Sequence, residues 1–228
     1  MTRLLLFDID GTLVSTGGAG GRAMARAFEE VFGFSNGLRS ISMAGRTDAW
    51  IVSQMAAEHG LRYDEQRFRD FHHSYVKHLA VEVLQPGPQK GVLPGVRPLL
   101  DTLASRDRPF LALLTGNFRR GAEIKLEHFE LWHYFRGGAF GDDSHDRNGL
   151  LWKALADVEA AGGPAVRPSE VVIIGDTPLD VAVAVAGGAR SLGVATGSYD
   201  VETLLESGAD VALPDLDDLD SVLAALNL

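Results

Sequence analysis

The sequence predicts an α/β protein built on a doubly wound parallel sheet, with a helical domain inserted near its start. Five short apolar runs have the length of buried strands, and helical stretches separate the last four. Such a pattern is typical of a parallel sheet covered by helices on both faces. Residues 15–90 contain no convincing strand. We therefore expect a core domain of residues 1–14 and 91–228 and a helical domain of residues 15–90.

The expected strands share one feature, which is that each apolar run is followed by turn-forming or polar residues. Such residues mark the points where the chain leaves the sheet. The runs are Leu4 to Phe7, Phe110 to Leu114, Val171 to Ile174, Ser191 to Ala195 and Asp210 to Leu213.

Helices are expected between the later strands, because parallel neighbours need a crossover connection. Residues 182–186 have β-forming composition, but they lie between two strand candidates and must supply such a crossover. In the insertion, apolar residues at spacings of three and four predict amphipathic helices. The expected helices cover 96–106, 119–130, 149–161 and 182–186 in the core, and 22–32, 48–59 and 64–83 in the insertion.

Composition narrows the classes of function. Among 228 residues, 31 are acidic and 21 basic, for a formal net charge of -10. This balance argues against nucleic acid as a partner, since such binding needs a basic surface. The absence of cysteine excludes disulfides, thiolate metal sites and cysteine nucleophiles. No stretch approaches the ~20 apolar residues of a membrane span. We expect a cytoplasmic protein, monomer or homodimer, with no membrane partner.

The segment Asp8-Ile9-Asp10-Gly11-Thr12 directly follows the first expected strand. Two carboxylates therefore stand at the carboxyl end of a strand, which is the edge where open α/β sheets bind ligands. Carboxylates this close repel each other unless a cation or a proton intervenes. The pair indicates a divalent metal and suggests a nucleophile beside an acid/base.

Two other expected strands end in polar residues that would lie at the same edge. Thr115-Gly116-Asn117 follows one of them, and Asp176 and Asp180 follow the other. Carboxylates without histidine or cysteine favour a hard cation, and we expect Mg²⁺. A hydroxyl with neighbouring backbone N–H groups suits a phosphoryl oxygen. The sequence therefore predicts one site for Mg²⁺ and a phosphate group.

Three ordered motifs resemble those of the haloacid dehalogenase (HAD)-like hydrolase superfamily, and the nearest resemblance is to its phosphoglycolate-phosphatase-like branch. The resemblance covers essentially the whole chain. It implies a Rossmann-like core with an inserted α-helical cap. The three segments match the family's first motif (Asp8 to Val14), second motif (Leu114 to Asn117) and fourth motif (Ile174 to Asp180).

The resemblance also implies a function, the Mg²⁺-dependent hydrolysis of a small phosphomonoester such as phosphoglycolate or a sugar phosphate. Asp8 would attack phosphorus and become an aspartyl-phosphate. Asp10 would protonate the leaving alkoxide and later activate water. The metal ligands would be Asp8, the backbone carbonyl of Asp10 and Asp176, with Asp180 orienting the metal shell. Phosphoryl oxygens would be held by Thr115, Gly116 and Asn117.

The sequence departs from the family pattern at two positions. The family usually has a lysine in its third motif, where this chain offers Arg147 or, one helical segment later, Lys153. We favour Arg147, whose guanidinium could bind phosphoryl oxygens as a fork. Ser15 stands where phosphoglycolate phosphatases commonly have aspartate, which leaves the substrate open. In the insertion, Arg46 could meet a substrate carboxylate, or its segment could simply form a helix start.

Two other functions remain compatible with these motifs. A phosphosugar mutase would share the aspartyl-phosphate, but it needs an acid/base in the cap, for which the segment 46–48 is not an obvious source. A non-catalytic protein that binds a phosphorylated ligand could use the same fold, since fold does not fix function. The intact pair Asp8 and Asp10 argues against the loss of catalysis.

Overall fold

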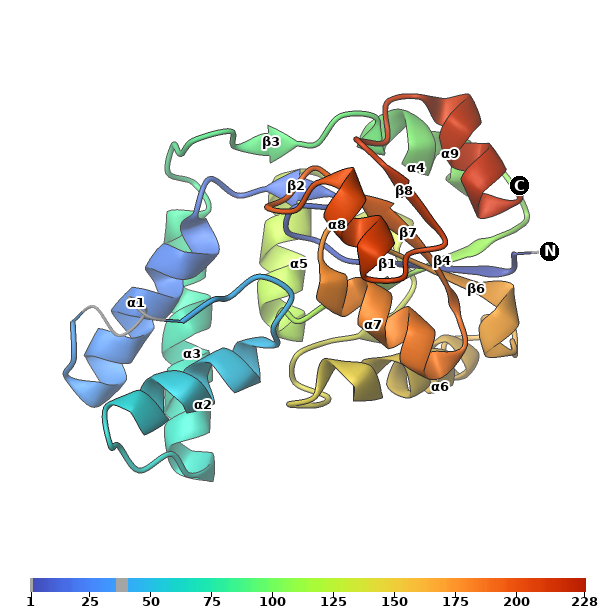
Figure 1. Cartoon of the computed structure of the whole chain (residues 1–228). Coiled ribbons are helices and arrows are strands. Elements are labelled where there is room, and N and C mark those ends of the chain that lie inside the picture. The colour runs from blue at the N-terminus through green and yellow to red at the C-terminus, as the bar shows by residue number, and fades with distance from the viewer. Residues whose placement is uncertain (1, 36–40) are drawn as a thin grey trace.

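A six-stranded parallel sheet forms the centre of the computed structural model, which describes residues 2–35 and 41–228 (Figure 1). The strand order is β5-β4-β1-β6-β7-β8, so the first strand lies in the middle. The predicted doubly wound α/β fold is confirmed. The strands are β1 (Leu4–Phe7), β4 (Phe110–Leu114), β5 (Gly138–Ala139), β6 (Val171–Gly175), β7 (Arg190–Val194) and β8 (Val211–Leu213).

Strand β1 pairs in parallel with β4 on one side and with β6 on the other. In this register Phe7 lies opposite Leu113 and opposite Ile174. The residues that follow these three strands therefore leave the sheet at one common edge. The central place of β1 follows from its sequence, since all four of its residues are apolar and completely buried.

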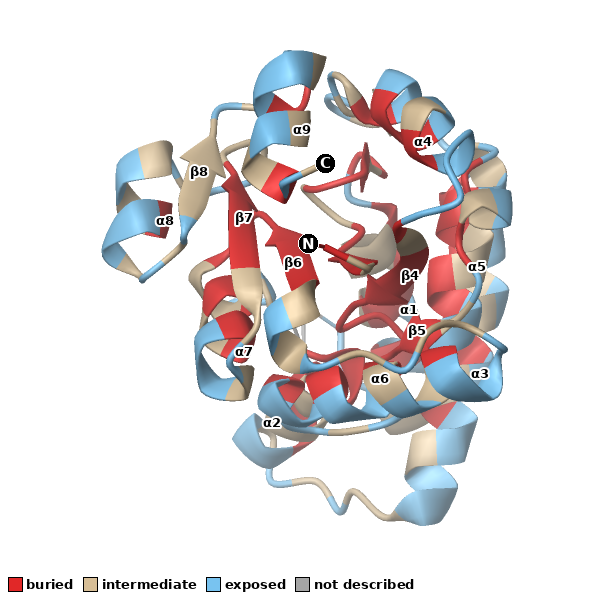
Figure 2. Cartoon of the chain, turned by 90° about the vertical axis from the view of Figure 1, so that its right-hand side faces the viewer, coloured by how far each residue is buried: buried red, intermediate tan, exposed pale blue. Residues whose placement is uncertain are grey.

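Buried residues lie in the sheet and in the helices around it (Figure 2). The alternation of side chains along β1 divides this core into two layers. Leu5 and Phe7 pack with one set of helices, and Leu4 and Leu6 pack with the other. The sheet is therefore covered on both faces. The first set is α4 (Val96–Ala104), α5 (Arg119–His128) and α9 (Leu219–Leu226), the second is α6 (Leu150–Ala160) and α7 (Pro178–Gly187), and the short α8 (Val201–Glu206) precedes β8.

Three helices between β2 and β3 lie together beside the sheet (Figure 1). Their apolar faces form a separate buried cluster around Phe28, Met55 and Phe71. Phe118, which stands directly before α5, also belongs to this cluster and connects it to the start of that helix. Within the described residues, no helix combines the length and apolarity needed to cross a membrane. The three helices are α1 (Ala19–Phe32), α2 (Asp48–Glu58) and α3 (Glu65–Glu82).

Most element boundaries agree with the sequence-based expectation to within a few residues, but three differences are informative. A two-residue strand, β5, adds an edge to the sheet and was not expected. A short antiparallel pair, β2 (Val14–Ser15) with β3 (Gly91–Val92), joins the two ends of the helical segment. Helix α7 begins at Pro178, earlier than expected, because the Thr177 side chain accepts a hydrogen bond from the Asp180 amide and caps it.

Candidate active site

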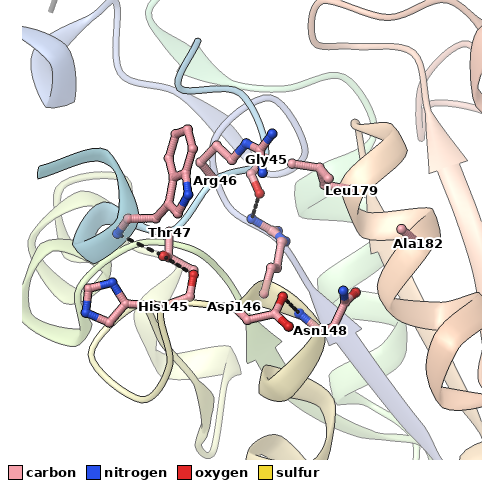
Figure 3. Close-up of a pocket in the computed structure, with 10 residues that line it drawn as sticks. Gly45, Arg46, Thr47, His145, Asp146, Asn148, Leu179 and Ala182 are labelled. Carbon is pink, nitrogen blue, oxygen red and sulfur yellow. Dashed lines mark hydrogen bonds between the residues drawn. The ribbon is translucent and has the colours of Figure 1, made fainter. Parts of the chain in front are cut away.

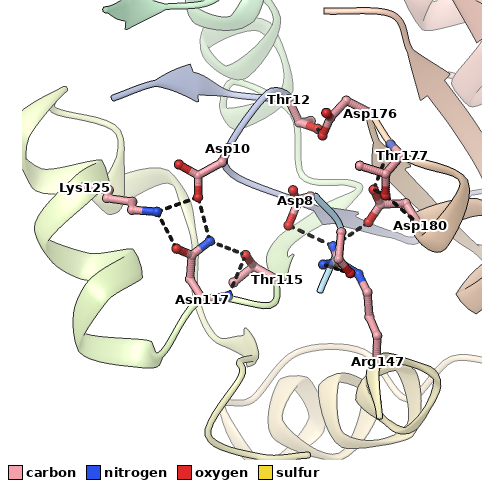
Figure 4. A network of polar contacts seen from close by, with 11 residues as sticks. Asp8, Asp10, Thr12, Thr115, Asn117, Lys125, Arg147, Asp176, Thr177 and Asp180 are labelled. Atoms are coloured by element: carbon pink, nitrogen blue, oxygen red, sulfur yellow. Dashed lines mark hydrogen bonds and ion pairs between the residues drawn. The ribbon is translucent and has the colours of Figure 1, made fainter. Parts of the chain in front are cut away.

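Three strands deliver polar side chains to the same edge of the sheet (Figure 4). Asp8 follows β1, Thr115 follows β4 and Asp176 follows β6. The backbone N–H of Asp8 donates to the carbonyl of Ile174 over 2.9 Å, so the β1–β6 ladder continues up to the site. This hydrogen bond fixes the backbone position from which the carboxylate of Asp8 extends.

The turn after Asp10 requires glycine for two reasons. Gly11 has φ 83°, in the left-handed region that side chains disfavour. A Cβ atom at this position would also lie 2.4 Å from Oδ2 of Asp176. Next to this turn, the Thr12 hydroxyl donates to Oδ1 of Asp176 over 3.1 Å. The first motif therefore both supplies carboxylates and orients Asp176.

Arg147 is the cation that the structure brings to these carboxylates. It is buried, and its Nη2 atom lies 2.9 Å from Oδ1 of Asp8 and 2.5 Å from Oδ1 of Asp180. Its Nε atom is buried without a hydrogen-bond partner among the described residues. Lys153, the other candidate, is half exposed and pairs instead with Asp143 at 3.7 Å.

Asp180 is fully engaged by its neighbours. Its Oδ2 accepts hydrogen bonds from the amide and the hydroxyl of Thr177, at 3.1 and 2.7 Å. Its Oδ1 accepts the bond from Arg147. This capping box at the start of α7 therefore holds Asp180 as a fixed partner for the guanidinium.

Asp8, Asp176 and Asp180 form a buried acidic cluster, in which one oxygen of each lies within 4.8 Å of the others. Burial raises the pKa of Asp8 to about 6. Burial, reinforced by the charges of Asp8 and Asp180, raises the pKa of Asp176 to about 8. Although burial alone would lower it, the same carboxylates Asp180 and Asp8 raise the pKa of Arg147 above its ordinary value. The cluster has an excess of negative charge that a cation would relieve.

An all-oxygen donor set of this kind could hold a hard divalent metal. In the part of the chain that the structure describes, Oδ2 of Asp8 and Oδ2 of Asp176 accept no hydrogen bond, whereas both oxygens of Asp180 do. Asp8 and Asp176 therefore retain free ligand atoms. Asp180 is better placed to orient its neighbours than to bind the metal.

Asp10 belongs to a second network, with Thr115, Asn117 and Lys125 (Figure 4). The Asn117 amide donates to Oδ2 of Asp10 over 2.9 Å and to the Thr115 hydroxyl oxygen over 2.8 Å. Lys125 was not among the residues expected from the sequence. A signal was present, since Lys125 is three residues after the buried Ala122 and therefore on the inner face of α5.

The loop before α2 rests directly on this edge of the sheet. The carbonyl of Gly45 accepts a hydrogen bond from Nη1 of Arg147 over 3.0 Å, and the amide of Asp48 donates to the carbonyl of Gly116 over 2.7 Å. Gly116 permits this approach, since a Cβ atom there would lie 2.1 Å from the carbonyl oxygen of Arg46. The helical segment thus contacts both the cation and the second motif.

A cavity of about 350 Å³ opens between this loop and the core, and Arg46 and Arg147 both line it (Figure 3). The guanidinium of Arg46 lies over the ring of Trp50, 4.4 Å from its centroid. His145 and Asn148 contribute polar groups from the core side. The cavity therefore combines an apolar wall with a cation beside the carboxylate cluster.

Asp48 is a buried acid at the interface between the helical segment and the sheet. Its Oδ2 accepts a hydrogen bond from the amide of Phe118 over 2.8 Å. Burial raises the pKa of Asp48 to about 7, although Lys125 and the Phe118 amide oppose the shift. The side chain of Asp48 is therefore occupied by a hydrogen bond across this interface.

The chain belongs to the haloacid dehalogenase-like hydrolase family, whose model matches residues 5–184. The matched region contains every site residue described above, so the predicted membership is confirmed.

Individual proteins resemble this chain over nearly its whole length. A protein named phosphoglycolate phosphatase from Chromobacterium violaceum is 28% identical over 229 residues, which cover 95% of this chain and 94% of the relative. A hydrolase from Pseudomonas syringae shares the fold with a TM-score of 0.70 at 24% identity, covering 98% of both chains. CbbY from Rhodobacter sphaeroides, solved in complex with phosphate, has a TM-score of 0.72 at 19% identity and covers 100% of both chains.

Proposed function

We propose that this protein is a Mg²⁺-dependent phosphatase that hydrolyses a small phosphomonoester, such as phosphoglycolate or a sugar phosphate, through an aspartyl-phosphate. The observation that supports this most is the contact between Asp8 and Arg147, which pairs a buried carboxylate at a strand end with a buried guanidinium, a group whose geometry suits phosphate. The relative named phosphoglycolate phosphatase supports the substrate class.

In the first half of the reaction, a carboxylate oxygen of Asp8 attacks phosphorus and forms the acyl–phosphate bond. The bond from phosphorus to the ester oxygen breaks, and Asp10 gives its proton to the departing alkoxide. In the second half, Asp10 takes a proton from water while the water oxygen attacks phosphorus. The bond between phosphorus and the Asp8 oxygen breaks, inorganic phosphate leaves, and the Asp8 carboxylate is restored.

The phosphoryl oxygens would be held by Arg147, Thr115 and backbone amides of the second motif. The Nε–H of Arg147 has no partner among the described residues and is available as a donor. The oxygen of Thr115 already accepts from Asn117, so its hydroxyl hydrogen can donate to a phosphoryl oxygen. These donors would stabilise the charge of the phosphoryl group as it transfers.

The residues present fit a magnesium ion. Asp8, Asp176 and the backbone carbonyl of Asp10 would hold it, while Asp180 would keep Arg147 and the start of α7 in position. When bound, Mg²⁺ would neutralise the phosphoryl group and the excess carboxylate charge. A fit of this kind is supported by the Oδ2 atoms of Asp8 and Asp176, which accept no hydrogen bond from any residue that the structure describes.

Residues 15–90 would act as a cap on a core of residues 1–14 and 91–228. The cap would choose the substrate through the cavity lined by Arg46 and Trp50. A guanidinium held against an aromatic ring presents its N–H groups in a fixed direction, which suits a carboxylate. We therefore propose that Arg46 binds the acidic end of the leaving group.

The test is a screen of small phosphate esters with purified protein, including phosphoglycolate and hexose phosphates, with released phosphate as the readout. Each ester is assayed with Mg²⁺ and with a chelator. We expect release from at least one ester, dependent on Mg²⁺. A folded protein that releases phosphate from none of them would refute the proposal.

A phosphosugar mutase is less well supported. It would need an acid/base in the cap, and the carboxylate of Asp48 is already bound to the amide of Phe118. Product analysis with a hexose phosphate separates the two functions. A phosphatase yields free sugar and phosphate, whereas a mutase yields an isomeric sugar phosphate.

A further inference from the structure

Lys125 is a buried lysine outside the three motifs, and its ammonium group has two short contacts. The Nζ atom lies 2.6 Å from Oδ2 of Asp10 and 2.6 Å from Oδ1 of Asn117 (Figure 4). Only 4% of the residue is exposed, although it occupies an ordinary helical position in α5. A buried ammonium is costly unless it is paired, so its presence here calls for a reason beyond packing.

The contacts on Asp10 are all directed to one of its two oxygens. Lys125 and Asn117 both donate to Oδ2, and within residues 2–35 and 41–228 no hydrogen bond reaches Oδ1. The carboxylate of Asp10 is itself 42% exposed, so packing alone would not fix its orientation. Two donors on one oxygen hold the other oxygen in a constant direction.

The surroundings of Lys125 leave room for its ammonium group. Gly20, near the start of α1, has no side chain to crowd the ammonium group. A Cβ atom at this position would lie 3.2 Å from Nζ, which is tighter than an ordinary contact. Asn117 accepts the second contact through its Oδ1 atom, and its side-chain nitrogen donates to the hydroxyl oxygen of Thr115. The lysine thereby links the orientation of Asp10 to that of Thr115.

We propose that Lys125 is a positioning residue, which turns Oδ1 of Asp10 toward the reacting ester and keeps it there. The inference rests on the proposed function, because it concerns the proton that Asp10 gives to the leaving alkoxide. A general acid works only within hydrogen-bond reach of the atom that it protonates. Loss of Lys125 would therefore harm most the substrates whose leaving group needs that proton.

The experiment compares two substrates in Lys125→Met and in the conservative Lys125→Arg. The first substrate is p-nitrophenyl phosphate, whose leaving group departs with little protonation. The second is the best alkyl phosphate from the ester screen. The measured quantity is kcat/KM, which reports the step that forms the aspartyl-phosphate. Lys77→Met is the matched control, since Lys77 is an exposed lysine of α3 that contacts only Glu30 among the described residues, at 3.5 Å.

We expect Lys125→Met to lower kcat/KM for the alkyl phosphate at least about tenfold more than for p-nitrophenyl phosphate, as for a displaced general acid. Lys125→Arg should recover most of the difference, and Lys77→Met should match the wild type. An equal loss on both substrates, or no loss, would overturn the assignment. Absence of turnover by the wild type would overturn the proposed function and the inference together.

Should Lys125→Met fail to fold, Lys125→Gln repeats the comparison, because a glutamine amide can still pair with Asn117 while lacking the charge. The same substrate-dependent loss in Lys125→Gln supports the positioning role. Equal effects on the two substrates in that variant overturn it.

Discussion

Nη2 of Arg147 lies 2.9 Å from Oδ1 of Asp8, and both side chains are almost completely buried. The same nitrogen reaches Asp180, so one guanidinium balances two carboxylates. This arrangement explains why an acidic cluster can be buried at the carboxyl ends of β1 and β6. It also places a guanidinium beside the carboxylate that, in the proposed reaction, attacks phosphorus.

Arg147→Met tests this arrangement. It should lower kcat about a hundredfold or more, as expected when a donor to the transferring group is lost. It should also destabilise the fold by about 3 kcal/mol, because two buried carboxylates lose their partner. The measurements are phosphate release and thermal unfolding. Lys153→Met is the control, since Lys153 pairs with Asp143 outside the site. Loss of activity in Lys153→Met alone would identify Lys153 as the cation.

Arg46→Met should change the choice of substrate. If Arg46 binds the acidic end of the leaving group, the variant should raise KM for phosphoglycolate about tenfold or more, the effect of losing a charged hydrogen bond. It should leave KM for a neutral alkyl phosphate nearly unchanged. Steady-state kinetics on both substrates provide the measurement. Equal changes in the two KM values would contradict the role.

Asp180→Asn should weaken the metal site without removing a ligand. Because Asp180 fixes Arg147 and the first turn of α7, we expect roughly a 10–100-fold loss of Mg²⁺ affinity or activity. Asp176→Asn, which removes a proposed ligand, should cost more. The Mg²⁺ dependence of turnover measures both variants. A larger effect of Asp180→Asn than of Asp176→Asn would indicate that Asp180 binds the metal directly.

Asp48→Asn should alter how stability depends on pH. The folded pKa of Asp48, about 7, lies above its ordinary value of 3.8, so the native state favours the protonated form. Protonated Asp48 therefore adds its full stabilisation to the free energy of unfolding below about pH 3.8. This stabilisation is lost as the pH rises to about 7, and the loss is on the order of a few kcal/mol. Asparagine mimics the protonated acid and avoids this loss.

Thermal unfolding from pH 4 to pH 8 checks the prediction for Asp48. The stability of Asp48→Asn relative to the wild type should increase with pH over this range and level off above about 7. A difference between the two proteins that does not vary with pH would show that Asp48 is charged throughout.

The larger elements of the fold could be predicted because their signals are local. The apolar run of β1 and the capping residues of the helices are visible in the sequence, and parallel pairing then places Asp8 and Asp176 at one edge. The pair β2 and β3 and the edge strand β5 were missed, since strands of two residues have no periodicity to detect.

The site was predictable to the extent that motifs mark it. Arg147 was expected at the third motif, and its contact with Asp8 depends on the packing of a 3₁₀ turn, Arg147–Gly149, that no sequence pattern specifies. Lys125 was missed because a single lysine in a helix is usually exposed. Its role depends on a tertiary contact with Asp10, 115 residues away in the chain.

The proposed mechanism requires that Asp8 becomes phosphorylated. The most direct measurement is mass spectrometry of peptides from acid-quenched protein that has been mixed with Mg²⁺ and its best phosphate ester. We predict a phosphoryl group on the wild-type peptide that contains Asp8, and neither this modification nor phosphate release in Asp8→Asn. Phosphate release by Asp8→Asn at the wild-type rate would exclude Asp8 as the nucleophile.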